Sequence, residues 1–494
     1  MVNPMHSGND TPEQAVPSPA GRAEGLFFGL ALVYFGVKAM YFALRIRDHI
    51  FPDESSWFGM AELFSRSAWL PVDSPESYHL GLVTHIPTLY FFLMGKLLLF
   101  NVLPVDDLIF LRLVNVLLAL VTVTYAWRLA RLLGVPLAVR CLFMVMVTNT
   151  VMFTFVSGSV NNDNLSTLLA VLSLYYLLRF FQGRSTWHGL LFALFLLAGP
   201  LSKSVFVPYA AALVLVLLFH EHRRLLELPR AVAARFSTLG WRETILVVLC
   251  LAGLAANLQL YGGNKLRHGA LLPSMDRVLP VAACLNNRLF ARDYVVREYQ
   301  AGKLTMLEAQ RVALRIRDPG DRASALSRLA EAASSKAKGG EARMSRLRYA
   351  REWVEVMVAR TYSVAAHLSL FKYDRDFYPY YALFALAGLL WLCRLRTLLI
   401  PGLGGVGFVA LFYTLFLMQV VGYVIYRGSG FTGVATTGRY LFPALVALYL
   451  VTAHGLLARM PRWWQAGAGV AVGLWFIAGE FPWFLRHAGP EWYF

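Results

Sequence analysis

Two adjacent carboxylates, Asp53 and Glu54, follow the first hydrophobic segment of the chain, in the stretch HIFPDESSWFGMAELF (residues 49–64). A carboxylate beside a membrane can accept the proton of a hydroxyl group when loss of water raises its pKa, or it can orient that hydroxyl. The pattern therefore indicates two candidate catalytic residues. The alternative is structural, because PDESS is also typical of a proline-led, acid-rich first turn that complements a helix dipole.

A second acidic stretch, NNDN (residues 161–164), lies between two later hydrophobic segments. Asn162 and Asp163 can position a sugar, an acceptor or a divalent cation, since Mg²⁺ and Ca²⁺ prefer oxygen ligands. The spacing identifies no metal site, so a divalent cation (Mg²⁺ or Ca²⁺) is an open alternative and no cofactor is predicted with certainty. A turn followed by a helix N-cap is the structural alternative, because Asn and Asp serve well in both.

Two cations lie in similarly apolar surroundings: Lys203 in GPLSKS and Arg439 in TTGRYLFPAL. An ammonium between two apolar segments is costly unless it meets water or an anion, and a guanidinium can bind phosphate through paired hydrogen bonds. Both are therefore candidate phosphate contacts, with anchoring at the membrane surface as the alternative. His85 can also bind phosphate or acceptor, although a histidine at a membrane interface is often structural.

The elements that carry these residues are membrane helices. The 494 residues are 57% hydrophobic and 15% charged, with a mean hydropathy of +0.53. About 20 apolar residues cross a bilayer core. Hydropathy therefore predicts an all-α integral membrane protein with about eleven transmembrane helices, near residues 25–46, 108–127, 141–158, 164–181, 187–200, 204–220, 243–261, 378–393, 398–425, 440–458 and 464–484.

The short loops show a charge asymmetry that orients these spans. Loops on one side carry basic stretches such as RLARLLGVPLAVR, RFFQGR and ARMPRWW, and loops on the other side carry little positive charge. Basic loops face the cytoplasm, so the N-terminus is predicted to be inside. Asp53, Asp163, Lys203 and Arg439 then all fall on the outer face. The net charge of +17 orients the protein and faces anionic lipids; no binding motif accompanies it, so nucleic acid is not an expected partner.

The chain divides into four regions on these criteria. Residues 1–24 are polar and rich in Pro, Gly and Ser, which predicts a disordered tail. Residues 25–262 form the first transmembrane part, and its first outer loop (47–107) is expected to hold two interfacial helices, in SSWFGMAELFSRSAW and HIPTLYFFLMGKLLLFNVLP. Residues 263–377 are basic and helical, and 378–494 contain the last spans. A basic outer segment suits an anionic acceptor or anionic lipid headgroups, or it is a lid.

Several of these stretches together resemble a known family. The acidic pair after the first span, the following interfacial helices, HIPTLY, LRLVNVLLALVTVTYAWRLARLLG, SGSVNNDN, GPLSKS and TTGRYLFPAL are similar to motifs of the GT-C superfamily of membrane glycosyltransferases. The branch with aminoarabinose transferases and protein O-mannosyltransferases is the most similar, together with related bacterial membrane proteins. The resemblance covers most of residues 25–205 and 430–460.

The resemblance implies transfer of a sugar from a polyprenyl-phosphate carrier to a glycan, lipid or protein acceptor. The site would face the periplasmic or outer side of a bacterial inner (plasma) membrane. The leading acid of the family aligns with Asp53, which is then the base, while Glu54 binds the acceptor or a cation. Asn162, Asp163, Lys203, Arg439, His85 and Tyr440 are the implied substrate contacts.

Other functions remain alternatives at this point. A transporter or flippase of lipid-linked sugars would carry inverted repeats and charges near the bilayer midplane, whereas here no convincing repeat is present and the polar residues gather at one surface. An O-antigen ligase or glycan polymerase would use a pyrophosphate-linked donor. The acidic pair directly after the first span favours the enzyme that uses a monophosphate-linked donor.

Overall fold

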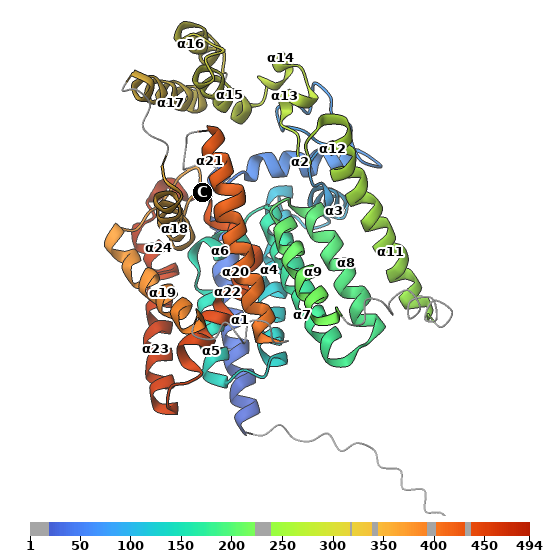
Figure 1. Ribbon diagram of the computed structural model, residues 1–494, viewed down its shortest axis with the longest axis vertical. Helices are drawn as coiled ribbons and strands as arrows, with labels where there is room; N and C mark the ends of the chain where they lie inside the picture. Colours follow the sequence, from blue (N-terminus) through green and yellow to red (C-terminus); the bar gives the residue numbers. More distant parts are fainter. Residues whose placement is uncertain (1–18, 223–238, 317–318, 338–343, 393–401, 430–435) are drawn as a thin grey trace, which may run out of the picture.

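The protein is described by a computed structural model, which covers residues 19–222, 239–316, 319–337, 344–392, 402–429 and 436–494 (Figure 1). These residues are mainly helical and contain no β-strand, only two isolated bridges. The predicted all-α integral membrane fold is confirmed. Residues 1–18 of the predicted tail lie outside the described ranges, as do parts of the basic loop after residue 222 and of the Gly/Thr-rich loop before Arg439.

A bundle of apolar helices forms the body of the molecule. Its members are α1 (Pro19–Arg45), α4 (Asp107–Leu132), α5 (Leu137–Thr148), α6 (Val151–Ser157), α7 (Asn162–Gly183), α8 (Thr186–Ser202), α9 (Phe206–Glu221), α11 (Trp241–Asn257), α19 (Tyr378–Leu392), α20 (Leu403–Phe416), α21 (Tyr423–Ser429), α22 (Phe442–Leu457), α23 (Arg462–Ala478) and the short α24 (Phe481–His487). π-helical turns join α11 to α12 (Gly263–His268) and α20 to α21.

Each of the eleven predicted spans contains a helix. Seven helices of the described part are long and apolar enough to cross a membrane, and the bent pair α5–α6 raises this number to eight. Helices α8, α9 and α19 are shorter. Eleven spans therefore stay a prediction.

The spans differ in how much of their surface they bury. Helix α7 and the span that contains α22 are buried over most of their length, whereas α1, α11 and α23 are largely exposed on the bundle surface. A helix that is apolar on all sides is typical of the centre of a membrane bundle. Because Asp163 and Arg439 lie at the starts of the two central spans, the fold places both at the interior of one bundle end.

Two short helices cover that end of the bundle. α2 (Glu54–Arg66) lies across the bundle axis and packs against α3 (Leu89–Leu98) (Figure 1). They coincide with the two predicted interfacial helices, although α3 is shorter than the predicted 85–104.

The segment 263–377 is helical, as predicted, and contains α13 (Met275–Val278), α14 (Val281–Cys284), α15 (Arg288–Gln300), α16 (Met306–Leu314), α17 (Pro319–Ala337) and α18 (Arg346–Tyr362). Helices α15 to α17 pack around a small core of their own, which includes Ala291, Val295, Ala309 and Leu329. Helix α18 instead packs against the bundle, beside the turn η5 (Gly438–Leu441) that carries Arg439.

Candidate active site

Four charged side chains from distant parts of the sequence meet at the covered end of the bundle. Arg439 donates through Nη2 to the Asp53 carboxylate, and its Nη1 lies 3.5 Å from Asp163 Oδ2. The Lys203 ammonium lies 2.6 Å from Asp163 Oδ1 and 5.7 Å from the centre of the Tyr440 ring. The four side chains form one ion network, with two carboxylates and two cations.

Asp53 occupies the N-cap position of α2 without acting as a cap. Its backbone is left-handed (φ 59°), a conformation that Asp adopts more readily than most residues, and its side chain makes no capping hydrogen bond. The carboxylate is thereby free to face Arg439. PDESS is thus a helix start, as the structural alternative held, and it also delivers an acid to the network.

Asp163 does not cap α7, because the neighbouring Asn161 does so. Asn161 is the N-cap of α7, and its side chain accepts a hydrogen bond from the Asp163 backbone N–H at 3.0 Å. Asp163 lies in the first turn with no exposed surface, where the helix dipole favours a carboxylate. The NNDN stretch therefore provides both the cap and an acid.

The two cations come from irregular backbone between helices. Lys203 follows α8 in an extended conformation, and Arg439 lies in the 3₁₀ turn η5 before α22. A Cβ atom on Gly438 would lie 2.5 Å from the backbone of Arg360 in α18, so only glycine fits at this close approach. Helix α18 thus fixes the turn that presents Arg439.

The pKa of Asp53 is set by opposing effects. Burial by itself raises the pKa of this carboxyl, but Arg439, with smaller contributions from Lys203 and His367, holds it below its ordinary value. Asp53 is therefore ionised while it remains paired with Arg439.

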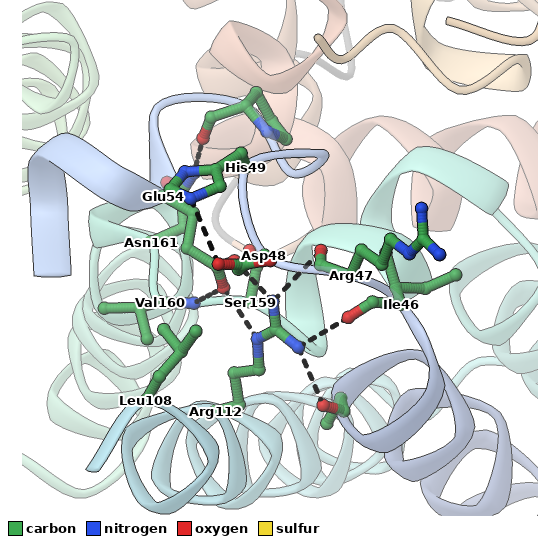
Figure 2. A network of polar contacts seen from close by, with 12 residues as sticks. Ile46, Arg47, Asp48, His49, Glu54, Leu108, Arg112, Ser159, Val160 and Asn161 are labelled. Atoms are coloured by element: carbon green, nitrogen blue, oxygen red, sulfur yellow. Dashed lines mark hydrogen bonds and ion pairs between the residues drawn. The ribbon is translucent and has the colours of Figure 1, made fainter. Parts of the chain in front are cut away.

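Glu54 has different partners from Asp53 (Figure 2). Arg112 of α4 binds its carboxylate through Nε at 2.9 Å and Nη2 at 2.6 Å, and the Val160 N–H donates to it at 3.0 Å. The two side chains are at most 1% exposed. The sequence predicts a catalytic role for Glu54, or binding of the acceptor or a cation. In the structure its enclosed carboxylate joins α2, α4 and the loop before α7, and the catalytic role stays a prediction.

The remaining predicted contacts divide in two. Tyr440 lies at the network, since its ring faces Lys203, whereas Asn162 is joined to it only as the residue before Asp163 in α7. His85 instead lies 3.1 Å from Asp73, with its ring against His268, and no contact of the described residues joins it to the network.

The sequence analysis did not single out Arg112 or His367. Arg112 stands in a predicted span, where an arginine without an evident partner is a signal that could have been used.

Several polar atoms near the network have no hydrogen-bond partner among the described residues: Asn162 Oδ1, Ser166 Oγ, Ser202 Oγ and Arg439 Nη1. Buried polar groups are normally paired, so such a group marks capacity for a ligand or water. Within the described part of the chain, no group of three or more His, Cys, Asp or Glu side chains is placed to hold a metal ion. The positive charge between Asp53 and Asp163 comes from Arg439.

An apolar cavity of about 890 Å³ lies between α18, α19, α20 and α22. Trp353 and Met357 of α18 line it, as do Phe384, Leu411 and Leu445 of the neighbouring spans. Leu441, two residues after Arg439, also contributes to its wall. One wall of the cavity therefore belongs to the turn that carries Arg439, although no member of the ion network lines it.

Residues 85–239 match the family model described as dolichyl-phosphate-mannose-protein mannosyltransferase. The predicted resemblance to GT-C glycosyltransferases is confirmed. The match covers less than half of the chain and includes Asp163 and Lys203. Asp53 and Arg439 lie outside it and join these residues in the folded structure. The enzyme class predicted from the sequence, a membrane glycosyltransferase, is the class that the family model describes. No curated protein matches the chain.

Three solved structures illustrate the range of structural likeness. The S. cerevisiae protein O-mannosyltransferase Pmt1-Pmt2 complex, bound to the sugar donor, shares 14% identity at a TM-score of 0.32, over 52% of this chain and 35% of that one. The Archaeoglobus fulgidus oligosaccharyltransferase AglB, in complex with an inhibitory peptide and a dolichol-phosphate, shares 11% identity at a TM-score of 0.44, over 92% of this chain and 55% of that one. ArnT from Cupriavidus metallidurans, bound to undecaprenyl phosphate, shares 15% identity at a TM-score of 0.35, over 96% of this chain and 82% of that one.

The chain thus spans about a third of the first of these proteins and about half of the second. With TM-scores below 0.5, these likenesses support no conclusion about the chain.

Proposed function

We propose that the protein transfers a sugar from a polyprenyl-phosphate-linked donor to an acceptor hydroxyl at the outer surface of the membrane. One observation carries the proposal: Asp53, Asp163, Lys203 and Arg439 join in a single network at one end of the bundle, in which only Asp53 is partly exposed. Such a network supplies both requirements of the reaction, a carboxylate base and positive charge for the leaving phosphate.

The network has no net formal charge, so an incoming phosphate must compete for its cations. Arg439 is the shared member, because it contacts both Asp53 and Asp163. When the donor phosphate binds Lys203 and Arg439, it displaces the Asp53 carboxylate from the guanidinium. This displacement removes the interaction that lowers the pKa of Asp53, and the phosphate adds a negative charge nearby, so the carboxylate becomes a stronger base.

The transfer step then balances as a displacement at the anomeric carbon. The acceptor oxygen forms a bond to that carbon as its proton passes to Asp53, and the bond between the carbon and the phosphate oxygen breaks. The leaving group is the polyprenyl phosphate, which gains one negative charge. Lys203 and Arg439 stabilise that charge.

The apolar cavity suits the carrier chain of the donor. Its wall includes Leu441 in the turn that carries Arg439, and extends along α22 as far as Thr452 and along α18 from Leu347 to Tyr362. A polyprenyl chain in this cavity would be removed from water, which is favourable in proportion to the buried apolar area.

The charge pattern supports an outward-facing site. In the described part, Arg131 and Arg140 meet Glu24 near the start of α1, at the opposite end of that helix from the network. Basic residues gather on the cytoplasmic side, so the network belongs to the outer side of a bacterial inner membrane. The acceptor is a glycan, lipid or protein that arrives beneath the basic segment 263–377.

The test of this function is transfer by the purified protein. Reconstituted wild type should move a radiolabelled sugar from a polyprenyl phosphate to acceptors extracted from the native envelope, and deletion of the gene should remove one surface glycan. Transport of intact lipid-linked sugar across the vesicle membrane without transfer would establish a flippase instead. Use of pyrophosphate-linked donors alone would establish a ligase or polymerase.

The sidedness has a separate test. In a variant with all native cysteines replaced, Gln300→Cys should react with a membrane-impermeant maleimide in intact cells, and Arg459→Cys should react only after permeabilisation. Both positions are exposed and stand at opposite ends of the predicted topology. Labelling of both from outside would contradict the orientation while leaving the transfer chemistry to be judged by the first assay.

A further inference from the structure

The third predicted span is broken although no proline or glycine stands at the break. Helix α5 ends at Thr148, α6 begins at Val151, and the two are inclined by 61°. Sharp bends usually occur at proline, at glycine or where a side chain enters the hydrogen-bond ladder. Residues 145–153 (VMVTNTVMF) contain neither proline nor glycine. Three local side chains bond back to the preceding turn: Thr148 to the Met144 carbonyl, Asn149 to the Val145 carbonyl and Thr150 to the Met146 carbonyl. Such bonds compete with the helix ladder and loosen it at this point.

The side chain of Lys38 in α1 enters the gap from outside the span. Its ammonium donates to the Thr148 carbonyl at 2.7 Å and to Asn149 Oδ1 at 3.1 Å, and it lies 2.5 Å from Glu480 Oε2. Lys38 is fully buried. A cation at the C-terminal end of α5 satisfies a carbonyl that a continuous helix would have used internally, and it complements the negative end of the helix dipole.

The other end of α6 is also held on α1. A Cβ atom on Gly158 would lie 2.8 Å from the Ala39 carbonyl oxygen, the Ala43 nitrogen and Phe42 Cβ, so only glycine permits this contact. Lys38 therefore fixes the start of α6 and Gly158 fixes its end, both against the same helix.

The residues that follow Gly158 build the site. The Val160 N–H donates to Glu54 at 3.0 Å, and the Asn161 side chain donates to the Pro52 carbonyl at 3.1 Å, beside Asp53. Asp163 follows as a member of the ion network. A change in the direction of α6 would therefore move both carboxylates of the network relative to each other.

Glu480 supplies the counter-charge from the far end of the chain. It has no exposed surface, and its Oε2 also accepts the backbone N–H of Phe481 at 2.8 Å, as the N-cap of α24. An ionisable residue inside a membrane span is costly and is usually associated with function. Among the described residues, Lys38 and Glu480 contact no member of the ion network. Their role is therefore something other than contact with the substrate.

We propose that Lys38 and Glu480 are positioning residues for the active site. The ammonium maintains the break between α5 and α6, and the break aims residues 158–163 at Asp53 and Glu54. The link to activity rests on the proposed transfer function; the link to the break does not.

Substitution of Lys38 tests both links. Lys38→Met keeps the length of the side chain and removes its donors, so α5 should continue toward α6 and the loop should shift. A misplacement of about 1 Å can cost about 100-fold in rate, so kcat for transfer should fall by about this factor while the donor KM changes much less. Lys38→Arg should recover part of the rate, because a guanidinium can still donate to the same oxygens.

Lys96→Met is the matched control. Lys96 also donates to carbonyl oxygens at a helix end, those of Phe64 in the last turn of α2 and of Ser67 at its C-cap. Among the described residues, no hydrogen bond or ion pair joins it to α1, α5 or α6. It should lower the melting temperature without the loss in kcat. An equal loss of kcat per folded molecule in Lys38→Met and Lys96→Met would overturn the proposal, as would an unchanged rate in Lys38→Met.

Two further measurements keep the test decisive. If Lys38→Met does not fold, Asn149→Ala removes one acceptor of the ammonium and leaves the ion pair; a graded fall in kcat supports the proposal and a wild-type rate contradicts it. Electron cryomicroscopy of the variant measures the bend directly, and an unchanged bend would refute the positioning role. If wild type transfers no sugar at all, the proposed function fails while the bend still decides the role of Lys38.

Discussion

Asp53 and Glu54 are neighbours in sequence and opposites in their surroundings. Glu54 receives three hydrogen bonds, two from Arg112 and one from the Val160 N–H, and is almost fully buried. Asp53 has one ion-pair partner, Arg439, and 29% of its side chain remains exposed. The first carboxylate is enclosed by the protein, and the second can be reached by a substrate.

The two environments also differ in what they leave unpaired. Arg112 donates to the Ala43, Ile46 and Arg47 carbonyls as well as to Glu54, so the cation of that pair is fully used. Around Asp53, in the described part of the chain, Arg439 Nη1 lacks a hydrogen-bond partner. A fully bonded ion pair stabilises the fold, whereas an incompletely bonded one can bind and release a ligand.

The largest expected effect is the loss of transfer rate when Asp53, the proposed base, is replaced. Asp53→Asn keeps the shape of the side chain and removes the base, so donor should still bind while transfer falls by about 100- to 10,000-fold. The measurement is single-turnover transfer with saturating lipid donor. Asp48→Asn, at a half-exposed aspartate five residues earlier, is the control. A wild-type rate in Asp53→Asn would remove Asp53 from the mechanism and favour the transporter alternative.

The next largest effect is the loss of stability when Glu54 is replaced. Glu54→Gln leaves Arg112 buried without its counter-charge, which typically costs about 3–5 kcal/mol, so the melting temperature in detergent should fall strongly. The folded fraction should retain most of its transfer rate. Glu62→Gln, in the same helix, breaks only an exposed pair with Arg66 and should cost at most about 1 kcal/mol. A stable but inactive Glu54→Gln protein would instead assign Glu54 to catalysis.

A smaller effect tests the cations. Lys203→Ala or Arg439→Ala should weaken donor binding by about 10- to 150-fold, equivalent to the loss of one charged hydrogen bond (about 1.5–3 kcal/mol). Arg439→Lys should recover only part of this, because a lysine cannot form the paired contacts of a guanidinium. Lys265→Ala, at an exposed lysine, is the control. Unchanged donor affinity in both Ala variants would leave these residues as structural members of the network.

The smallest effect is the pH dependence that Asp53 contributes. Its pKa is lowered in the folded protein, so its ion pair stabilises the fold above the unfolded pKa, about 3.9, and this stability is lost as pH falls through the lower folded pKa. Stability of wild type should therefore decline on acidification below about pH 4, and Asp53→Asn should reduce that decline. Equal slopes in the two proteins would show that Asp53 gains nothing from Arg439.

The pH dependence of kcat and of kcat/KM also reports the protonation of Asp53. If donor phosphate displaces Asp53 from Arg439, the acid limb of kcat should lie at higher pH than that of kcat/KM for the donor, since the first reports the donor complex and the second the free enzyme. Coincident limbs would contradict the proposed displacement.

Much of the molecule follows from its sequence. Hydropathy predicts the helical membrane bundle, and helical spacing of apolar residues predicts α2 as an interfacial helix. Five predicted residues, Asp53, Asp163, Lys203, Arg439 and Tyr440, meet at one site. Four of the five are charged, and charged groups are costly in apolar surroundings, so each of these four stands out in the sequence alone. Their roles at the site stay predictions.

The choice of partners was decided only by tertiary structure. Nothing in PDESS tells which acid is enclosed and which is open, because Arg112 and Arg439 lie 58 and 386 residues from their partners. The bond that Lys38 makes at the break between α5 and α6 was equally hidden, since Lys38 belongs to another helix and its counter-ion, Glu480, is 442 residues further along. Local sequence determines which groups need a partner; packing of distant helices determines which partner each one meets, and thus which carboxylate remains available for chemistry.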